Sequence, residues 1–440
     1  MKYQEAVDYL ESLNVYGIIP GLDSIRRLCE ELGNPQKALS FVHIAGTNGK
    51  GSVLAYISTI LKCAGYRVGR FMSPAIFQYR EMIQVNEKSI PQTAFCRGVE
   101  IVREACDRLV ERGFPHPTCF EAETALAFWY YREKKCDMVV LECGMGGLGD
   151  TTNIIENTCI SVITSISMDH MKFLGHSLAD IAKQKAGIMK PGRPVVTLNQ
   201  APEVMEVLKQ EAFANHCPLV VADCGQLSKI RYGLEAQRFQ WRAMQNLEIG
   251  MAGRFQVENA LLALQAVEVL CGQGFLIKEA AIRKGLRETR WPGRFQVIDK
   301  KPIFIVDGAH NEDAARKLAD SIEFYFTNKR IIYIMGVLRD KEYDKVIALT
   351  HRYADQIITV TPPHNPRGMS AYDLALAVAK EHPRVTAADS LEEAVEISYL
   401  LAGKEDVILA FGSLSYLGRL LQIVQNRKPA QRKGRQHGKS

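Results

Sequence analysis

Short apolar runs alternate along the chain with longer segments whose apolar residues recur at helical spacing. Half of these runs lie in the first two hundred residues, at 38–46, 137–144, 159–167 and 193–199. The others lie in the last third of the chain, at 301–308, 329–337, 355–362 and 406–413. Nearly continuous apolar strands separated by helices are typical of a parallel sheet that is covered on both faces. The pattern therefore predicts an α/β protein.

The stretch WPGRFQVIDKKP, at 291–302, interrupts this alternation with two prolines, a glycine and a cluster of charges. Strand and helix signals begin afresh after it, and 440 residues exceed the usual size of one domain. We therefore predict one domain over 1–297 and a smaller one over 298–426. The last fourteen residues hold six Lys or Arg and no acid, and we predict a disordered basic tail over 427–440.

Composition and charge exclude several classes of protein. The net charge of +6 equals the charge of the tail, and no basic stripe with interleaved aromatic residues accompanies it, so we expect no nucleic-acid partner. No apolar run approaches the ~20 residues that span a bilayer, and the N-terminal segment lacks an apolar signal core. The eleven cysteines are scattered and include no CxxC pair, which indicates reduced thiols. We expect a cytoplasmic protein without a membrane segment.

The segment HIAGTNGKGS, at 43–52, joins the first predicted strand to a predicted helix with an apolar stripe of Val53, Tyr56, Ile57, Ile60 and Leu61. The first N–H groups of a helix have no internal partners and its dipole is positive there, so a phosphate chain can bind. The glycines allow close approach of the backbone, Lys50 can reach terminal phosphates, and Ser52 or Thr47 can ligate magnesium. The loop therefore predicts a nucleotide site.

The spacing of this loop departs from the common G-x-x-x-x-G-K-[ST] pattern. Two residues are missing between the glycines, and Gly51 stands between Lys50 and Ser52. The alternative is a structural glycine-rich turn with a surface lysine. The context of strand, loop and helix favours nucleotide binding.

Two polar groups follow other predicted strands and are candidates for the same edge of the sheet. Glu142 ends one apolar run, and His170 comes shortly after another. A carboxylate and an imidazole suit a magnesium site only in part, because histidine is an uncommon magnesium ligand. Glu142 as a cap of the next turn and His170 as an ordinary hydrogen-bonded residue stay open at this point. The lysines at 183, 185 and 190 are equally open between a solvated face and a role beside the metal.

Nine motifs follow one another along the chain: GTNGKGS, SPAIFQYREMIQVN, PTCFEAETALAF, VVLECGMGGLGDTTN, SISMDH, KQKAGIMKPG, GRFQVEN, WPGRFQV and DGAHN. In this order they resemble the Mur ligase superfamily, and within it the folylpolyglutamate synthase and dihydrofolate synthase family. The resemblance implies a P-loop parallel-sheet ATPase domain followed by a smaller Rossmann-like α/β domain. It also implies a monomeric ligase that uses ATP and Mg²⁺ to add L-glutamate to the γ-carboxyl of tetrahydrofolate and its polyglutamates, through an acyl phosphate.

The resemblance also assigns roles to residues of this sequence, with ATP held between both domains. Nucleotide contacts are implied for Gly46, Thr47, Asn48, Gly49, Lys50, Gly51, Ser52, Asn259, Arg294 and Asp307. Metal contacts are implied for Ser52, Ser73, Glu142, His170 and Lys185, the last as a carbamylated lysine. The pterin side of the substrate is assigned to Phe120, Glu121 and Asp150, and the incoming glutamate to Ser413. A catalytic role is implied for Lys50, His170, Lys185, Asp307 and His310.

The chain departs from the family pattern at three places. It reads Ser73-Pro74-Ala75-Ile76 where SPHL is usual, and Gly146-Gly147-Leu148-Gly149-Asp150-Thr151-Thr152-Asn153 where GGRLDATN is usual. Near the start it reads Ile19-Pro20-Gly21 where members that use dihydropteroate often carry DLG. None of these departures removes a residue for which an ATP or metal contact is implied. They leave open whether dihydropteroate is a second substrate.

Two other functions compete with this interpretation. A Mur-type ligase could act on another carboxylate, but the peptidoglycan enzymes usually carry an extra N-terminal UDP-binding domain, and here the loop begins at residue 46. A non-catalytic regulator that binds a nucleotide is the second alternative. It would form no product from tetrahydrofolate and glutamate.

Overall fold

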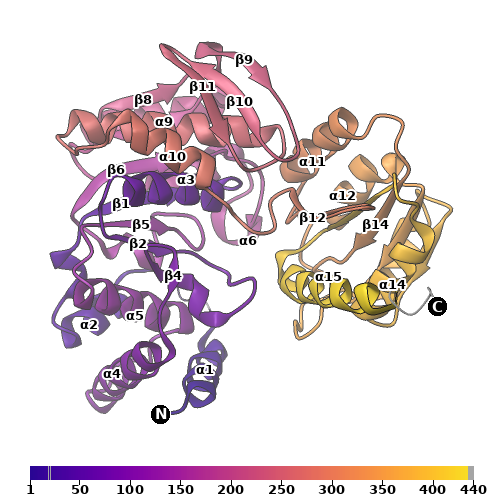
Figure 1. Ribbon diagram of the computed structural model, residues 1–440. Coiled ribbons are helices and arrows are strands. Elements are labelled where there is room, and N and C mark those ends of the chain that lie inside the picture. Colours follow the sequence, from indigo (N-terminus) through magenta and orange to yellow (C-terminus); the bar gives the residue numbers. More distant parts are fainter. Residues whose placement is uncertain (18, 20, 435–440) are drawn as a thin grey trace. The chain divides into compact units, whose positions relative to one another are not determined.

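The computed structural model describes residues 1–17, 19 and 21–434, which form two compact units. The first unit comprises 1–230, 239–249 and 257–289, and the second comprises 231–238, 250–256 and the chain from 290 on (Figure 1). The predicted boundary at 297 falls inside strand β12 (Gln296–Lys300), which belongs whole to the second unit.

An eight-stranded sheet forms the centre of the first unit, in the order β4-β3-β2-β5-β1-β6-β7-β8. The six strands from β2 to β8 in this order are parallel, and β3 and β4 are antiparallel additions at one edge. Their bounds are β1 Phe41–Ala45, β2 Val68–Phe71, β3 Ile83–Val85, β4 Lys88–Ser89, β5 Met138–Glu142, β6 Thr158–Ile163, β7 Val195–Leu198 and β8 Leu219–Ala222. A separate three-stranded sheet consists of β9 Leu227–Arg231, β10 Gln237–Trp241 and β11 Met244–Ile249.

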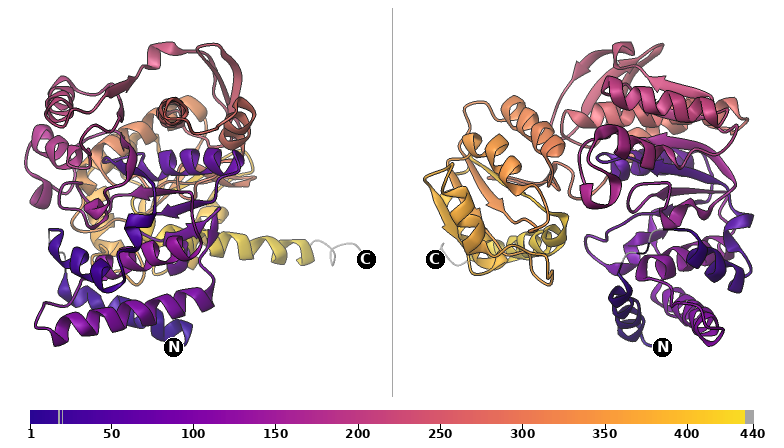
Figure 2. Two further views of the ribbon diagram at one scale, coloured as in Figure 1. Left: turned by 90° about the vertical axis from the view of Figure 1, so that its left-hand side faces the viewer. Right: turned by 180° about the vertical axis from the view of Figure 1, so that it is seen from behind.

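Helices cover both faces of the large sheet, as the continuous apolar strands predict. Every residue of β1 is buried, and the ring of Phe41 packs edge-on against the ring of Phe128 on one face of the sheet. Helices α3, α9 and α10 lie on one side of the sheet and α1, α2, α4 and α5 on the other (Figures 1 and 2). The helices of this unit are α1 Tyr3–Ser12, α2 Asp23–Glu31, α3 Lys50–Cys63, α4 Gln92–Glu111, α5 Cys119–Glu133, α6 Met171–Leu174, α7 Leu178–Ala186, α8 Pro202–Ala214, α9 Phe255–Gly272 and α10 Glu279–Glu288.

The second unit is built on a six-stranded sheet in the order β12-β13-β17-β14-β15-β16, in which only β12 runs antiparallel to its neighbour. The further strands are β13 Ile303–Val306, β14 Ile331–Met335, β15 Gln356–Thr359, β16 Val385–Ala387 and β17 Val407–Phe411. Its helices are α11 Glu312–Tyr325, α12 Tyr343–Thr350, α13 Ala371–Val378, α14 Leu391–Leu401 and α15 Leu414–Gly434. The predicted α/β class is confirmed for both units.

The C-terminal part of the chain differs from the prediction, because helix α15 extends to Gly434. Residues 427–434 were expected in a disordered tail, but they continue this helix, and residues 435–440 lie outside the described part of the chain. None of the described helices has an apolar stretch long enough to cross a bilayer.

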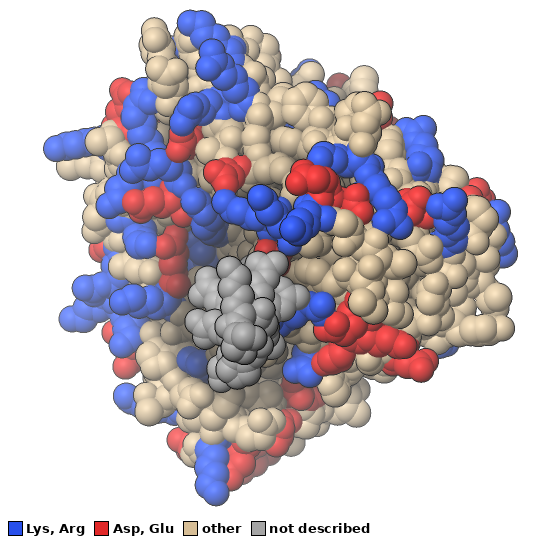
Figure 3. Space-filling model, turned by 45° about the vertical axis from the view of Figure 1, so that its right-hand side comes forward, with Lys and Arg blue, Asp and Glu red and all other residues tan. Residues whose placement is uncertain are grey.

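Charged side chains of both signs are interspersed on the face of the molecule drawn in Figure 3. In the second unit, for example, the ammonium of Lys345 lies 2.9 Å from Glu312 and 2.8 Å from Glu342. Exposed pairs of this kind contribute less than about 1 kcal/mol each, so the stability of the fold depends on its apolar core.

Candidate active site

The glycine loop leaves the carboxyl end of β1 and enters helix α3, as predicted. Gly46 has a φ of +150°, and a Cβ built on it would lie 1.8 Å from Oγ1 of Thr164. Gly49 precedes the first residue of α3 with a φ of +89°, and its Cβ would lie 2.7 Å from Oδ1 of Asn259 on α9. Both positions therefore require glycine, and the second one lies next to Asn259, for which the resemblance implies a nucleotide contact.

The segment after β6 holds the glycine loop in place. The amide of Thr47 donates to the carbonyl of Ser165 at 2.7 Å, and its hydroxyl donates to the carbonyl of Ser167 at 3.0 Å. The amide of Ser167 in turn donates to that hydroxyl at 3.1 Å. Because the Thr47 hydroxyl is occupied by these bonds, Ser52 is the better candidate for a metal ligand. Ser52 lies in the first turn of α3 and is 1% exposed.

Two lysines and a carboxylate converge on the loop. The ammonium of Lys50 lies 3.2 Å from the carbonyl oxygens of Gly46 and Thr47 and 4.0 Å from Oε1 of Glu142. Lys185 on α7 donates to the same Gly46 carbonyl at 2.8 Å. Burial, reinforced by the charge of Lys50, lowers the pKa of Lys185 to about 7. A cationic pair beside the amides of a helix N-terminus is a suitable environment for a polyphosphate.

His170 lies on the segment that follows the residues holding the loop. It has a φ of +50° directly before α6, its side chain is 39% exposed, and its Nε2 lies 3.9 Å from Oδ1 of Asp169. Ser73, which follows β2, is found instead on the wall of a neighbouring pocket. The described residues contain no group of three or more His, Cys, Asp and Glu side chains placed to hold a metal ion by themselves.

The neighbouring pocket has a volume of about 260 Å³ and contains two of the residues predicted to face the pterin. Phe120 and Asp150 line it together with Ser73, Ile19 and Phe173. The carboxylate of Asp150 accepts hydrogen bonds from the amides of residues 145 and 152, at 2.8 Å and 3.0 Å, and so shapes the glycine-rich loop of the pocket. Burial raises the pKa of Asp150 above its usual value.

Glu121 is not part of this pocket. Its carboxylate accepts hydrogen bonds from the amide of Thr118 at 2.7 Å and from the hydroxyl of Ser24 at 3.0 Å. Together with Thr118 it forms the capping box of helix α5 and faces a second hollow of about 250 Å³. The structure therefore places Glu121 in a helix cap, while Phe120 of the same turn reaches the first pocket.

In the second unit, the remaining predicted residues gather where the parallel strands β13 and β17 end. Asp307 follows β13 and accepts hydrogen bonds from the amides of Phe295 and Ala309, both at 2.8 Å. Burial raises the pKa of Asp307, although the charge of Arg294 opposes this shift. A Cβ at residue 308 would lie 2.1 Å from the guanidinium of Arg294, so a glycine there makes room for it. His310 bonds to the carbonyl of the same glycine at 2.8 Å.

Ser413 follows β17 at the same end of this sheet. Its hydroxyl lies 2.9 Å from that of Ser415 and accepts from the Ser415 amide at 3.2 Å. These bonds fix the start of α15. The described hydrogen bonds of Ser413 are thus made within the first turn of the helix that follows it.

Family models and relatives match the chain over most of its length. The Mur ligase middle domain matches residues 113–267, and the Mur ligase glutamate ligase domain matches residues 293–414. The dihydrofolate synthase/folylpolyglutamate synthase of Bacillus subtilis is 33% identical over 422 residues, which are 94% of this chain and 97% of the relative. The chain belongs to this family.

Further members of the folylpolyglutamate synthase and dihydrofolate synthase family support this assignment. The folylpolyglutamate synthase of Lacticaseibacillus casei is 34% identical over 84% of this chain and 87% of its own length. A solved structure of Escherichia coli FolC in complex with DHPP and ADP has a TM-score of 0.85 at 28% identity and covers 97% of this chain and 99% of that one. The expected family and fold are confirmed.

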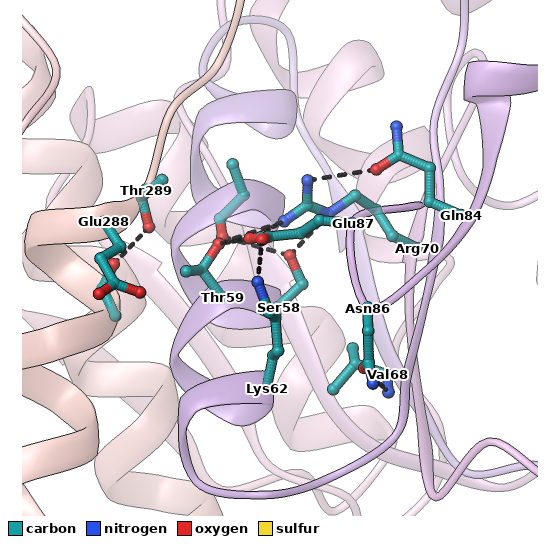
Figure 4. Close-up of polar contacts among 12 residues, drawn as sticks. Ser58, Thr59, Lys62, Val68, Arg70, Gln84, Asn86, Glu87, Glu288 and Thr289 are labelled. Atoms are coloured by element: carbon teal, nitrogen blue, oxygen red, sulfur yellow. Dashed lines mark hydrogen bonds and ion pairs between the residues drawn. The ribbon is translucent and has the colours of Figure 1, made fainter. Parts of the chain in front are cut away.

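One group of residues that positions helix α3 was not indicated by any pattern in the sequence. Arg70 on β2 is 5% exposed, and its guanidinium donates to Ser58 at 2.9 Å, to Thr59 at 3.2 Å and to Glu87 at 3.3 Å (Figure 4). Burial lowers the pKa of Arg70 to about 10. The group joins α3, β2 and the β3–β4 turn behind the glycine loop. Its members are up to 29 residues apart, so no local motif could have indicated it.

Proposed function

We propose that this chain is an ATP-dependent ligase that joins L-glutamate to the γ-carboxyl of tetrahydrofolate and its polyglutamates. One observation supports the ATP-dependent step most directly: Lys50 and Lys185 both contact the carbonyl of Gly46, beside Glu142 and the first amides of α3. The substrate follows from relatives named for this activity, which match nearly the whole chain.

The reaction has to replace a carboxylate oxygen, which is a poor leaving group. In the first step the substrate's γ-carboxylate attacks the γ-phosphorus of ATP, the bond to the β-phosphate oxygen breaks, and ADP leaves. In the second step the amine of glutamate attacks the acyl carbon, inorganic phosphate leaves with the bonding electrons, and the nitrogen loses a proton. The products are the amide, ADP and phosphate.

Both reacting groups of the first step are negative, so positive charge at the loop lowers the barrier. We assign to Lys50 the contact with the terminal phosphates, because its ammonium already lies over the loop carbonyls. We assign to the free amine of Lys185 the support of the loop from the opposite side, whereas a carbamylated Lys185 would offer a carboxylate to the metal. His170, Asp307 and His310 complete the proposed catalytic set.

The donor set at the loop fits magnesium that is shared with a nucleotide. Magnesium usually keeps several waters and binds through one or two carboxylates together with substrate phosphates, so a complete protein cage is unnecessary. Glu142 and Ser52 would supply hard oxygen ligands, with Ser73 and His170 as further candidates. When bound, the ion would neutralise charge that develops on the transferred phosphoryl group.

We assign the 260 Å³ pocket to the pteridine end of the substrate. The FolC structure was solved in complex with DHPP and ADP, so a relative of this chain binds such a ligand. Phe120 offers an aromatic surface, and Asp150 holds the glycine-rich wall. The contacts implied for Arg294 and Asp307 with the nucleotide, and for Ser413 with glutamate, belong to the same proposal.

A single assay tests the proposal. Purified protein is incubated with ATP, Mg²⁺ and labelled glutamate, and tetrahydrofolate and dihydropteroate are offered in separate reactions. We expect label in the tetrahydrofolate product, and label in the second reaction would add dihydrofolate synthase activity. Hydrolysis of ATP without label in either product would refute the proposal and would favour the nucleotide-binding regulator. Light scattering on the same sample tests the expected monomer.

A further inference from the structure

Beyond the predicted site residues, three polar side chains connect two walls of the 260 Å³ pocket. Tyr79 lies in the short 3-10 helix Tyr79–Met82, and its hydroxyl donates to Oε1 of Glu123 on α5. Cys119, one turn earlier on α5, lies 3.6 Å from both the Tyr79 hydroxyl and Oε1 of Glu123. Glu123 is only 7% exposed. No role proposed above uses this group.

Tyr79 belongs to a closed loop that begins beside the pocket. The amide of Met72 donates to the carbonyl of Met82 at 3.1 Å and so joins the ends of the loop. Inside it, the carboxylate of Glu81 accepts from the amide of Phe77 at 2.9 Å, so the loop has a defined shape of its own. Ser73, at its start, lines the pocket. A shift of the loop as one body would therefore move Ser73.

Helix α5 contributes the second wall of the pocket. Phe120 lies in its first turn, one residue after Cys119, and lines the same pocket as Ser73. The hydrogen bond from Tyr79 to Glu123 thus connects the element that carries Ser73 with the element that carries Phe120.

We propose that the hydrogen bond from Tyr79 to Glu123 acts as a latch that holds the 72–82 loop against helix α5 and so sets the affinity of the pocket for the substrate. Glu123 is then a positioning residue, which acts through Ser73 and Phe120. This inference rests on the proposed function, since it takes the pocket as the site of the folate substrate.

The strength of the latch depends on the charge of Glu123. A hydrogen bond to an ionised carboxylate is roughly twice as strong as one between neutral groups. Burial raises the pKa of Glu123 to about 7, although the hydrogen bonds from Tyr79 and Cys119 oppose the shift. Above this pH the carboxylate is charged and the latch is strong. Below it the latch weakens, so the KM for tetrahydrofolate rises as the pH falls through 7.

The two groups that bond to Glu123, Cys119 and Tyr79, do not titrate in this range. Burial, together with the charge of Glu123, raises the pKa of Cys119 to about 12, and the charge of Glu11 on α1 acts in the same direction. Burial likewise raises the pKa of Tyr79 far above its usual value. A pH dependence near 7 that disappears with Glu123 would therefore belong to Glu123.

The test uses Glu123→Gln and Tyr79→Phe in the full-length chain, with Cys119→Ser as the matched control. Glutamine still accepts a hydrogen bond from Tyr79 but carries no charge at any pH, and serine keeps a donor at position 119. At pH 8.5 we expect Glu123→Gln, which replaces a charge-assisted bond by a neutral one, to raise the KM for tetrahydrofolate about three- to fivefold. Tyr79→Phe removes the bond altogether and should raise it about tenfold. At pH 6 both should approach the parent, with the KM for ATP unchanged. Cys119→Ser should follow the parent at both pH values.

Melting temperatures and calorimetric binding of tetrahydrofolate accompany the kinetics, so that a folding defect is recognised. A parent KM that does not change between pH 6 and 8.5, or a change that persists in Glu123→Gln, would overturn the latch while the ligase activity stands. A Tyr79→Phe protein that matches the parent at pH 8.5 would do the same. A parent that binds no tetrahydrofolate would overturn both proposals.

Discussion

Replacement of Glu87 by glutamine tests how helix α3 is held behind the glycine loop. Glu87 is the acid that faces the buried guanidinium of Arg70, with 3.3 Å between Nη2 and Oε1 (Figure 4). Lys62 and the hydroxyl of Thr59 on α3 also bond to the Glu87 carboxylate. Glutamine keeps an oxygen at this position and removes the charge. The buried Arg70 cation then loses its ion pair.

The size of the effect follows from this geometry. Two unit charges 3.3 Å apart interact by about 5 kcal/mol at an effective dielectric constant of ~20. The Glu87 side chain is 31% exposed, so water screens part of this interaction, and we expect a loss of about 2 kcal/mol, below the ~3–5 kcal/mol of a fully buried pair. Lys62→Gln removes only the exposed half of the network and should cost less than about 1 kcal/mol.

Hydrogen exchange followed by mass spectrometry is the suitable assay, because a chain of two units does not unfold in one transition. A loss of ~2 kcal/mol predicts about thirtyfold faster exchange in the peptides of α3 and β2 of Glu87→Gln, and less than about fivefold in Lys62→Gln. Adding Arg70→Met to Glu87→Gln should recover part of the loss, since the buried cation that Glu87 neutralises is then removed as well. Equal exchange in the parent and Glu87→Gln would refute the reasoning. Strictly additive effects of Glu87→Gln and Arg70→Met would refute it as well.

Three predictions concern the proposed activity. Lys185→Met should lower kcat by ~10²-fold or more, because it removes a positive group at the loop. The melting temperature should not fall, because burial already disfavours the charged form of Lys185, and a parent-like kcat would contradict its role. Phe120→Ala should raise the KM for tetrahydrofolate about tenfold, by the loss of an aromatic contact of ~1.5 kcal/mol, with the KM for ATP as the internal control. Asp307→Ala leaves the amides of Phe295 and Ala309 without their acceptor, so label transfer to tetrahydrofolate should slow; an unchanged rate would remove Asp307 from the proposed catalytic set.

The strands and the main helix of the site were predictable because their signals are local. The apolar runs at 38–46 and 137–144 contain β1 and β5, and all five members of the stripe that follows the glycine loop are buried in α3. Strand and helix each have a fixed period of side-chain direction, so burial on one or both faces is visible in the sequence. The glycine loop was predictable for the same reason, since it occupies a short stretch between two such signals.

The backbone contacts of the buried carboxylates could not be predicted from family position alone. Asp150 reaches the pocket as expected, yet both of its oxygens accept backbone hydrogen bonds. Glu121 belongs to a T-x-x-E pattern with Thr118, and that pattern is a known signature of a capping box. This pattern was the available signal that the Glu121 carboxylate would accept a hydrogen bond from the backbone at the start of α5. A matching position in a family motif does not distinguish a residue that contacts a ligand from one that shapes the backbone around it.

The surroundings of Gly46 favour a functional loop over a purely structural turn. Lys50 and Lys185 are 135 residues apart in the sequence, yet both ammonium groups contact the same carbonyl. Two cations at one oxygen repel each other, and the lowered pKa of Lys185 reflects its burial first and this repulsion second. A structural turn needs neither lysine, because the bonds between Thr47 and the segment after β6 already fix the loop. An unfavourable pair of charges persists where a ligand of opposite charge compensates it, and a triphosphate on the amides of α3 would do so.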